Sequence, residues 1–283
     1  MASAPSLHEY YRAAKERLRA ARFETADLDA RLLIQAVLKL SPEDFFLKAD
    51  TLLADDDIKQ LDHFIDRRLK HEPVSRILGR RAFWKSEFIV TPDTLDPRAD
   101  SETLIEAVLE YVPPSETVLD LGTGTGCLLL SLLQEWPIAI GTGVDISPGA
   151  VNTARENAAA LLLQDRTSFF TSGWEDFFPD HKFDVIISNP PYITSGEMQE
   201  LEPDVRLYDP IKALEGGDSG LEAYQSLIRC LPRWVHPDTW IFFEIGSKQA
   251  LSVRKELEKA GFKVIDLRRD LGGNDRVLVA RVA

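Results

Sequence analysis

The stretch that decides the fold is Val118-Leu119-Asp120-Leu121-Gly122-Thr123-Gly124-Thr125-Gly126-Cys127, in which three alternate glycines follow a short apolar run. The run has the length and composition of a buried strand, and the apolar residues after the glycines are typical of a helix. Glycine at such a turn permits positive φ and lets a ligand touch the backbone. The free N–H groups at the start of the helix can bind an anionic group. A glycine-rich turn alone is a weak signal, because a tight turn without a ligand also uses glycine.

Apolar runs of strand length alternate with helical stretches through the rest of the chain. The expected strands are 117–121, 139–144, 167–170, 183–188, 239–245, 262–267 and 276–282. The expected helices are 103–111, 126–135, 148–162, 218–235 and 248–260. This alternation predicts an α/β fold with a mostly parallel sheet and helices on both faces. The last two strands have turn residues between them, so we expect an antiparallel hairpin at the sheet edge.

A carboxylate stands at the end of the second expected strand, in Gly143-Val144-Asp145. An acidic residue about 20 positions after the glycines is suited to bind the two hydroxyls of a ribose. The two features together predict a nucleoside cofactor, and both NAD and S-adenosylmethionine remain open. The spacing G-x-G-x-G departs from the dinucleotide pattern G-x-G-x-x-G and favours S-adenosylmethionine.

Asn189-Pro190-Pro191-Tyr192 follows the fourth expected strand. Ligands of open parallel sheets bind at the carboxyl ends of strands, which places this tetrapeptide beside the cofactor. Two prolines fix the backbone and donate no hydrogen bond, so the corner exposes carbonyl oxygens and the Asn189 amide. Tyr192 adds a flat face for stacking. Acceptors arranged in this way can orient a planar NH₂ group, either a carboxamide or the exocyclic amine of adenine or cytosine.

The N-terminal part predicts a small helical bundle, with apolar residues three and four positions apart. Ser41-Pro42-Glu43 is typical of a helix start. Phe83 to Val90 indicates a short hairpin. We therefore expect an N-terminal helical domain for substrate recognition over residues 1–80, a hairpin linker over 81–95 and a catalytic domain over 96–283.

The net charge of −13 lies entirely in the C-terminal two thirds of the chain. Residues 1–95 carry 16 basic and 16 acidic side chains, whereas residues 96–283 carry 17 and 30. A surface that bound nucleic acid there would need basic residues. No apolar run of membrane-spanning length and no signal peptide is present, so we expect no membrane partner. Two isolated cysteines and histidines at non-ligand spacings predict a cytoplasmic protein with no metal site.

The order of these segments, with Asp96-Pro97-Arg98-Ala99-Asp100-Ser101-Glu102 and Gly216-Gly217-Asp218-Ser219-Gly220-Leu221 among them, resembles the PrmC/HemK family of peptide chain release factor glutamine N5-methyltransferases. The resemblance covers nearly the whole chain. It implies a Rossmann-like class I methyltransferase sheet with an N-terminal helical bundle and a linking β-hairpin. It also implies S-adenosyl-L-methionine as cofactor, class 1 release factors as protein substrates and no direct contact with nucleic acid. The methylated group would be the glutamine of their Gly-Gly-Gln loop.

The resemblance also assigns roles to individual residues. Those implied around the cofactor are Gly122, Thr123, Gly124, Thr125, Gly126, Asp145, Trp174 and Asn189. Asn189, Pro190 and Tyr192 are the implied catalytic residues, and Pro191 joins them in binding the substrate glutamine. In the family the counterpart of Trp174 flanks the adenine.

One segment departs from the family pattern. The usual Pro-Arg-Pro-x-Thr-Glu has Ala99 in place of its second proline. We expect Asp100 or Ser101 to cap the following helix and keep the turn. Arg98 and Glu102 are each expected to form a structural ion pair.

Three other functions remain open. An adenine N6-methyltransferase would use the same tetrapeptide but would need a basic groove and a means of flipping the base. A glutamine methyltransferase acting on a ribosomal protein would share every motif. A non-catalytic binding module could keep the fold. Residues 193–222 carry eight acidic side chains against two basic ones, which predicts an acidic rim that attracts a basic protein loop.

Overall fold

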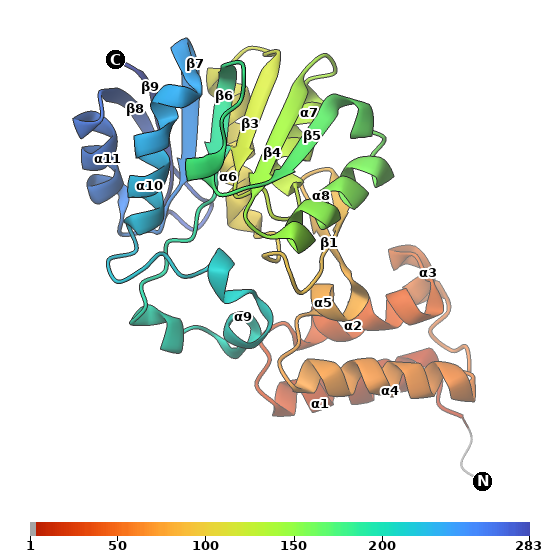
Figure 1. Ribbon diagram of the computed structural model, residues 1–283. Coiled ribbons are helices and arrows are strands. Elements are labelled where there is room, and N and C mark those ends of the chain that lie inside the picture. The colour runs from red at the N-terminus through yellow and green to blue at the C-terminus, as the bar shows by residue number, and fades with distance from the viewer. Residues whose placement is uncertain (1–3) are drawn as a thin grey trace. The chain divides into compact units, whose positions relative to one another are not determined.

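The computed structural model describes residues 4–283 and divides into two compact units, both drawn in Figure 1. The first unit contains the chain up to Gly79 together with Pro203–Tyr208. The second contains Arg80–Glu202 and Asp209–Ala283. The chain therefore passes from one unit to the other three times. Within residues 4–283 no helix combines the length and the apolar character needed to cross a bilayer.

The first unit is a bundle of short helices, as expected from the sequence. Its members are α1 (Leu7–Ala20), α2 (Ala26–Leu38), α3 (Pro42–Leu47), α4 (Asp55–Leu69), α5 (Val74–Leu78) and α9 (Pro203–Tyr208). The predicted start at Ser41 is confirmed, since the Ser41 side chain accepts a hydrogen bond from Asp44 N at 3.0 Å. The apolar faces of α1, α2 and α4 form one buried core that includes Leu18, Leu33 and Leu61.

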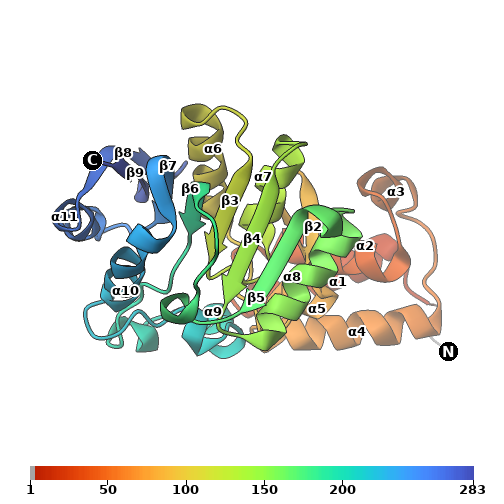
Figure 2. The same cartoon turned by 45° about the horizontal axis from the view of Figure 1, so that its top comes forward.

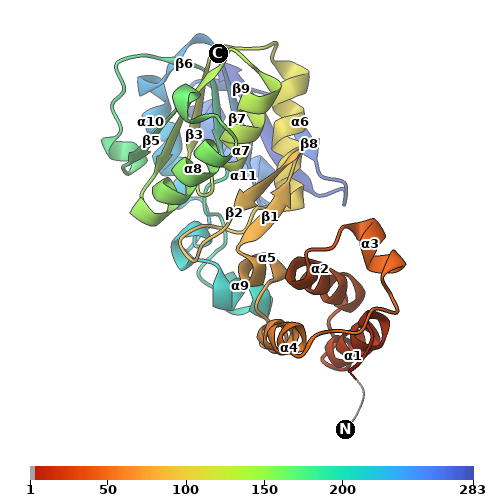
Figure 3. The same cartoon turned by 90° about the vertical axis from the view of Figure 1, so that its right-hand side faces the viewer.

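Helix α9 belongs to this bundle although it lies far away in the sequence (Figure 3). Its Asp204 accepts from the Arg68 guanidinium at 2.7 Å and lies 3.1 Å from His71 Nδ1. The Tyr208 hydroxyl donates to Lys70 O at 3.0 Å. Arg68 is buried and also binds Asp29 at 2.7 Å. This long-range pairing could not be predicted, because ion pairs leave no periodic pattern in the sequence.

The second unit contains a seven-stranded sheet in the order β5-β4-β3-β6-β7-β9-β8, of which β5 to β7 can be followed side by side in Figure 2. The strands are β3 (Thr117–Leu121), β4 (Ile140–Asp145), β5 (Thr167–Thr171), β6 (Phe183–Ser188), β7 (Val235–Glu244), β8 (Phe262–Arg269) and β9 (Asp275–Val282). Strands β3 to β7 are parallel, and β9 runs antiparallel between β7 and β8. The predicted parallel sheet and its closing antiparallel hairpin are confirmed.

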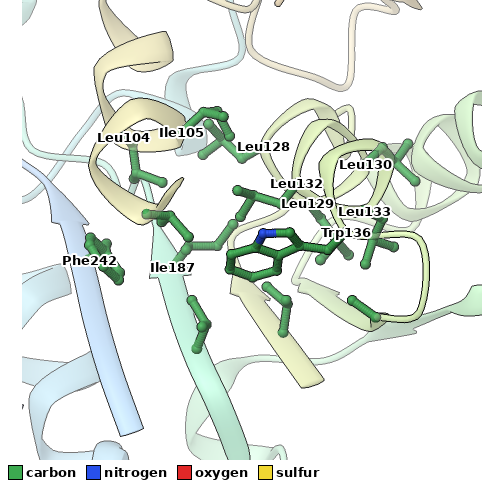
Figure 4. Close-up of a cluster of buried hydrophobic side chains, with 14 of the residues drawn as sticks. Leu104, Ile105, Leu128, Leu129, Leu130, Leu132, Leu133, Trp136, Ile187 and Phe242 are labelled. Carbon is green, nitrogen blue, oxygen red and sulfur yellow. The ribbon is translucent and has the colours of Figure 1, made fainter. Parts of the chain in front are cut away.

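Helices cover both faces of the sheet. On one face α6 (Glu102–Tyr111), α7 (Cys127–Glu135) and α8 (Pro148–Ala160) enclose the cluster drawn in Figure 4. On the other face α10 (Glu222–Cys230) and α11 (Ala250–Lys259) enclose a second cluster. Strand β6 serves both, since Val185 and Ile187 point into the first cluster and Ile186 into the second. A parallel strand buried on both faces reads as a continuous apolar run, which is why this region was recognisable.

Three expected boundaries differ from the structure. The hairpin begins at Arg80, with β1 (Arg80–Phe83) pairing β2 (Ser86–Ile89), and it packs in the second unit through Phe83 and Phe88. Helix α10 begins at Glu222, not at residue 218, because Gly220 has φ +72° and the chain before it is a turn. Strand β7 begins at Val235, four residues before its expected start, since Val235 already pairs with Phe183.

Candidate active site

A cavity of about 870 Å³ lies in the second unit, at the carboxyl ends of β3, β4 and β6. Most of the residues predicted from the sequence line it: Gly122, Thr123, Gly124, Thr125, Asp145, Trp174, Asn189 and Pro191. Gly126, Pro190 and Tyr192 are not among its lining residues. Within residues 4–283 no group of three or more potential metal ligands is present.

The glycine turn has the left-handed backbone that the sequence predicts. Gly122, Gly124 and Gly126 have φ of +77°, +54° and +77°. A Cβ on Gly122 would lie 3.9 Å from the Trp174 ring and 4.0 Å from Asn189 O, so a side chain there would project into the cavity. A Cβ on Gly126 would lie 3.3 Å from the Ala154 Cβ of α8. The third glycine thus permits the close packing of α7 and α8, away from the cavity.

Asp145 fixes the shape of this turn. Its Oδ2 accepts from Gly124 N at 2.9 Å, and its Oδ1 accepts from Ser147 N at 2.9 Å. Burial raises the pKa of Asp145, against the opposing effect of these backbone N–H groups. A carboxylate oxygen has two lone pairs, so both oxygens keep capacity for a further donor. The geometry is compatible with the predicted contact to ribose hydroxyls.

Asp120, on the strand before the turn, carries a buried carboxyl group that the sequence analysis did not single out. It is 1% exposed, its Oδ2 accepts from the Thr123 hydroxyl at 2.7 Å, and its Oδ1 has no hydrogen-bond partner within the described residues. Burial raises the pKa of Asp120 to about 7. Asp120 is not among the residues that line the cavity, and its carboxyl group supports the glycine turn through Thr123. Its position inside an apolar strand concealed it in the sequence.

Trp174 forms one wall of the cavity and is held in place from α10. Its indole Nε1 donates to the Ser226 hydroxyl oxygen at 2.9 Å, and that hydroxyl donates to Glu175 at 2.6 Å. The ring is half-buried and faces Gly122. The contact of this fixed flat surface with an adenine stays a prediction.

The corner at residues 189–192 is braced by one glycine-containing segment, residues 214–220. Ile193 N donates to Leu214 O at 2.9 Å, and Gly216 N donates to Ile193 O at 2.8 Å. A Cβ on Gly216 would lie 2.7 Å from Pro191 O, and one on Gly220 would lie 2.5 Å from Tyr192 O. The segment 216–221, which contributed to the family resemblance, therefore packs directly on the corner.

Gln249 completes this brace from the start of α11. Its Nε2 donates to Tyr192 O at 3.0 Å and to Gly220 O at 3.1 Å, while its Oε1 accepts from Gly246 N at 3.0 Å. The Tyr192 side chain packs against the core enclosed by α10 and α11, and burial raises the pKa of its hydroxyl to about 12. Gln249 could not be predicted as a site residue, because a single glutamine after a strand carries no distinctive pattern.

The capping prediction for the departing segment is wrong. Ala99–Ser101 forms a 3-10 turn that continues directly into α6, and no side chain caps that helix. The Ser101 hydroxyl instead accepts from Asn189 Nδ2 at 3.3 Å, and Asp100 accepts from Arg276 at 3.3 Å. A helix that extends an existing helical turn leaves no extended capping residue, so these side chains are available to the site.

The two ion pairs expected beside this turn have different outcomes. Arg98 lines the cavity and forms an ion pair with the buried Asp209, which confirms the prediction for Arg98. Glu102 instead accepts from Trp84 N at 2.8 Å, a hydrogen bond to the hairpin backbone that replaces the expected ion pair.

The eight acidic residues of segment 193–222 do not form one open rim. Asp204 pairs with Arg68, Asp209 pairs with Arg98, and Glu197 accepts from Thr194 N and Oγ. Glu215 and Glu222 also accept hydrogen bonds from their own loop. Much of the acidic charge therefore holds the loop in shape, which composition cannot distinguish from a steering surface.

The comparisons with known proteins agree with this site. Residues 90–202 match the family model described as methyltransferase small domain, which defines the class of protein. Residues 9–79 match the PrmC N-terminal domain. Over 266 residues the chain is 44% identical to the release factor glutamine methyltransferase of Rhodospirillum rubrum, covering 94% of this chain and 82% of that protein. It is 41% identical to that of Cereibacter sphaeroides, covering 96% of both. The chain belongs to the release factor glutamine methyltransferase family, which confirms the resemblance and the fold class.

S-adenosylmethionine is the cofactor of this methyltransferase, and the residues present fit it. The cavity combines a glycine turn at the start of α7, the acceptor Asp145 and the flat ring of Trp174. These groups suit an amino-acid end, a ribose and a base, respectively. When bound, the cofactor supplies an electrophilic methyl group on a sulfonium sulfur. The contact of each residue remains a prediction.

Proposed function

We propose that this chain methylates the side-chain nitrogen of the glutamine in the Gly-Gly-Gln loop of class 1 peptide chain release factors. The observation that carries the proposal is that the Asn189 corner and the glycine turn share one cavity. The cavity thus brings together the corner that we expect to orient a planar NH₂ group and the turn that we expect to bind the cofactor. The names of the relatives, which are release factor glutamine methyltransferases, support this choice of substrate.

The proposed chemistry depends on orientation. The lone pair of an amide nitrogen is delocalised, so the nitrogen is a poor nucleophile unless acceptors bind its hydrogens and return electron density to it. In our proposal Asn189 Oδ1 and a backbone carbonyl of the proline pair accept these two hydrogens, and Tyr192 packs behind them. The prolines cannot rearrange, so the acceptors are preorganised for the transfer.

The charge of the cavity lining supports a protein substrate over nucleic acid. Of the residues that line the cavity, Arg98 and Lys212 are the basic ones, and Arg98 is paired with Asp209. A polynucleotide would need a continuous basic path to neutralise its phosphates. We further propose that the helical first unit recognises the substrate and that the protein acts in the cytoplasm, where Cys127 and Cys230 stay as free thiols.

The proposal is tested by transfer from labelled cofactor to four substrates. These are a class 1 release factor, the same factor with its Gly-Gly-Gln glutamine changed to alanine, a mixture of ribosomal proteins, and total nucleic acid. We expect label on the first alone, with mass spectrometry placing one methyl group on the glutamine side chain. Label on the alanine variant would exclude this residue as the target. Label on ribosomal protein or on adenine alone would establish one of the alternative functions.

A further inference from the structure

Glu244 is a buried acidic residue next to the reaction corner. It ends β7, one position beyond the Phe243 that pairs with Ser188 on β6, so it lies level with Asn189. Its side chain is 2% exposed, and its Oε2 has no hydrogen-bond partner within the described residues. An acid buried in this way costs folding free energy, so its presence calls for a functional explanation.

Arg276, whose charge lowers the pKa of Glu244, forms its hydrogen bonds with other groups. Arg276 on β9 donates to Asp270 Oδ2 at 2.9 and 3.1 Å, to Asp100 at 3.3 Å and to Ile245 O at 3.4 Å. The backbone at Glu244 is also fixed, because the Tyr224 hydroxyl donates to Glu244 O at 2.9 Å. Arg276 therefore stabilises the surroundings of Glu244, while the carboxyl group faces the corner.

Two polar side chains lie on that side of Glu244. Ser101 and Asn189 are near enough that their polar hydrogens lower the pKa of Glu244, and Asn189 Nδ2 also donates to Ser101 Oγ at 3.3 Å. A hydroxyl has one hydrogen to donate. If Ser101 donates this hydrogen to the Glu244 carboxylate, its oxygen lone pairs are left to accept from Asn189 Nδ2.

We propose that Glu244 is a positioning residue for methyl transfer: through Ser101 it holds the Nδ2 end of the Asn189 carboxamide inward and thereby leaves Oδ1 to accept a hydrogen from the substrate amide. The inference rests on the proposed role of Asn189 in binding the substrate NH₂ group. A protonated Glu244 could donate to Ser101, whose hydrogen would then point to Asn189 and favour the opposite amide orientation. The ionised carboxylate is the form that orients the site correctly.

Burial raises the pKa of Glu244 to about 7, so both forms are populated near neutral pH. The charged and titratable groups that act on Glu244 or feel its charge are Asp100, Cys127, Tyr192, Tyr224 and Arg276. Burial raises the pKa of Cys127 and of Tyr192 to about 12, and it raises the pKa of Tyr224 well above its usual value. Asp120 also has a pKa of about 7 but lies at the glycine turn, where its main charged neighbour is Asp145.

The test is the pH dependence of kcat for the wild type and Glu244→Gln, at saturating cofactor and release factor between pH 6 and 8.5. Wild-type kcat should rise through about pH 7. Glu244→Gln keeps the size of the side chain, but its amide can both donate and accept and so does not fix the direction of the Ser101 hydrogen. The kcat of the variant should therefore not change with pH in this range. At pH 8 its kcat should be about three- to tenfold below the wild type, the size of one hydrogen bond of ordinary net strength. Cofactor affinity, measured by calorimetry over the same pH range, should be the same in both proteins.

Two further measurements separate the possible outcomes. Ser101→Ala should lower kcat by a similar factor, and the double variant should be no slower than either single one, because both remove one relay. An unchanged pH profile in Glu244→Gln, or a loss of cofactor affinity equal to the loss of kcat, would overturn the inference. A wild-type protein that transfers no methyl group to the release factor would refute the proposed function instead.

The ionisation of Glu244 can be checked without any substrate. Its pKa is higher in the folded than in the unfolded chain, so the unfolded chain loses this proton first as the pH rises. The wild type should therefore lose stability relative to Glu244→Gln between about pH 4.5 and 7, and the difference should stay constant above this range. A difference that does not change with pH would show that Glu244 titrates normally and would overturn the inference.

Discussion

The glycine turn at residues 122–126 and the corner at residues 189–192 belong to the same site, but different parts of the chain shape them. The turn is held by its own left-handed glycines and by one neighbouring strand end, where Val144 O and Asp145 accept its N–H groups. The corner is held by Ser101, Leu214, Gly216 and Gln249, which come from three other regions of the chain. A cofactor pocket can thus be a local property of the sequence, whereas a reaction site can be a property of the whole fold.

The largest expected effect separates the two regions by function. Asn189→Ala should lower kcat by about a hundred- to a thousandfold, the usual cost of losing one preorganised group that acts in the transition state. Cofactor affinity should change little, because the turn does not depend on this side chain. Single-turnover transfer and calorimetric titration of the cofactor measure the two quantities. If the variant keeps more than about a tenth of wild-type kcat, Asn189 does not take part in the methyl transfer.

Asp145 should show the reverse pattern. Asp145→Ala should weaken cofactor binding by about ten- to a hundredfold, since a hydrogen bond to a charged group contributes about 1.5–3 kcal/mol. Once the cofactor is saturating, kcat should recover. The matched control is Asp145→Asn, whose amide oxygen can still accept from Gly124 N and keep the turn. If both variants bind cofactor like the wild type, Asp145 does not contact the ligand.

A pair of glycine substitutions tests how each region is held. Gly124 has φ +54° and no atom within 4 Å of an added Cβ, so Gly124→Ala should destabilise the protein by about 1–2 kcal/mol through backbone strain. At Gly216 an added Cβ would lie 2.7 Å from Pro191 O and 2.8 Å from Tyr192 Cα. Gly216→Ala should cost about 1–3 kcal/mol through overpacking and should also lower kcat. Denaturant unfolding without cofactor gives the two free energies.

The same two substitutions can also show that the turn and the corner do not differ in how they are held. The corner would be as self-contained as the turn if Gly216→Ala left both stability and kcat unchanged. A loss of kcat without any loss of stability in Gly124→Ala would place that glycine, unexpectedly, in the transfer step.

The smallest effect concerns charge at long range. Glu200 and Glu202 have no described partner in the loop after the corner, in contrast to most acids of that segment. Changing both to glutamine should lower kcat/KM by no more than about threefold at low salt, because exposed charges act on association and are screened within about 8 Å at physiological ionic strength. The difference should vanish at high salt, and kcat should stay constant. If the double variant and the wild type have equal kcat/KM at low salt, Glu200 and Glu202 do not attract the substrate.

The sequence was informative where structure is local or periodic. The strands, the flanking helices and the three positive φ values at the turn follow from composition, spacing and the special properties of glycine. The motif at Asn189 was also visible, since two prolines between an asparagine and a tyrosine are uncommon. The side chains that hold this motif in place could not be predicted. Glu244 and Gln249 lie near the corner because β7 lies beside β6 in the sheet. No single segment of the sequence predicts this order of the strands.

The wrong capping prediction has the same origin. Ser101 was assigned to the helix that follows it, because neighbouring residues are the only partners that a linear pattern suggests. Its actual partner, Asn189, is 88 positions away. Long-range polar contacts of this kind account for most of what the sequence analysis missed at the site.

The placement of α9 in the helical bundle has a consequence for recombination between relatives. A chimera that exchanged residues 1–79 alone would combine one parent's Arg68, His71 and Lys70 with another parent's Asp204 and Tyr208. The six residues Pro203–Tyr208 must therefore be inherited with the N-terminus, although 123 residues of catalytic sequence separate them. Crossovers that respect this linkage need three junctions, at 79/80, 202/203 and 208/209. Variation in the N-terminal helices and in α9 should accordingly be correlated across natural sequences, as if the two segments were a single inherited cassette.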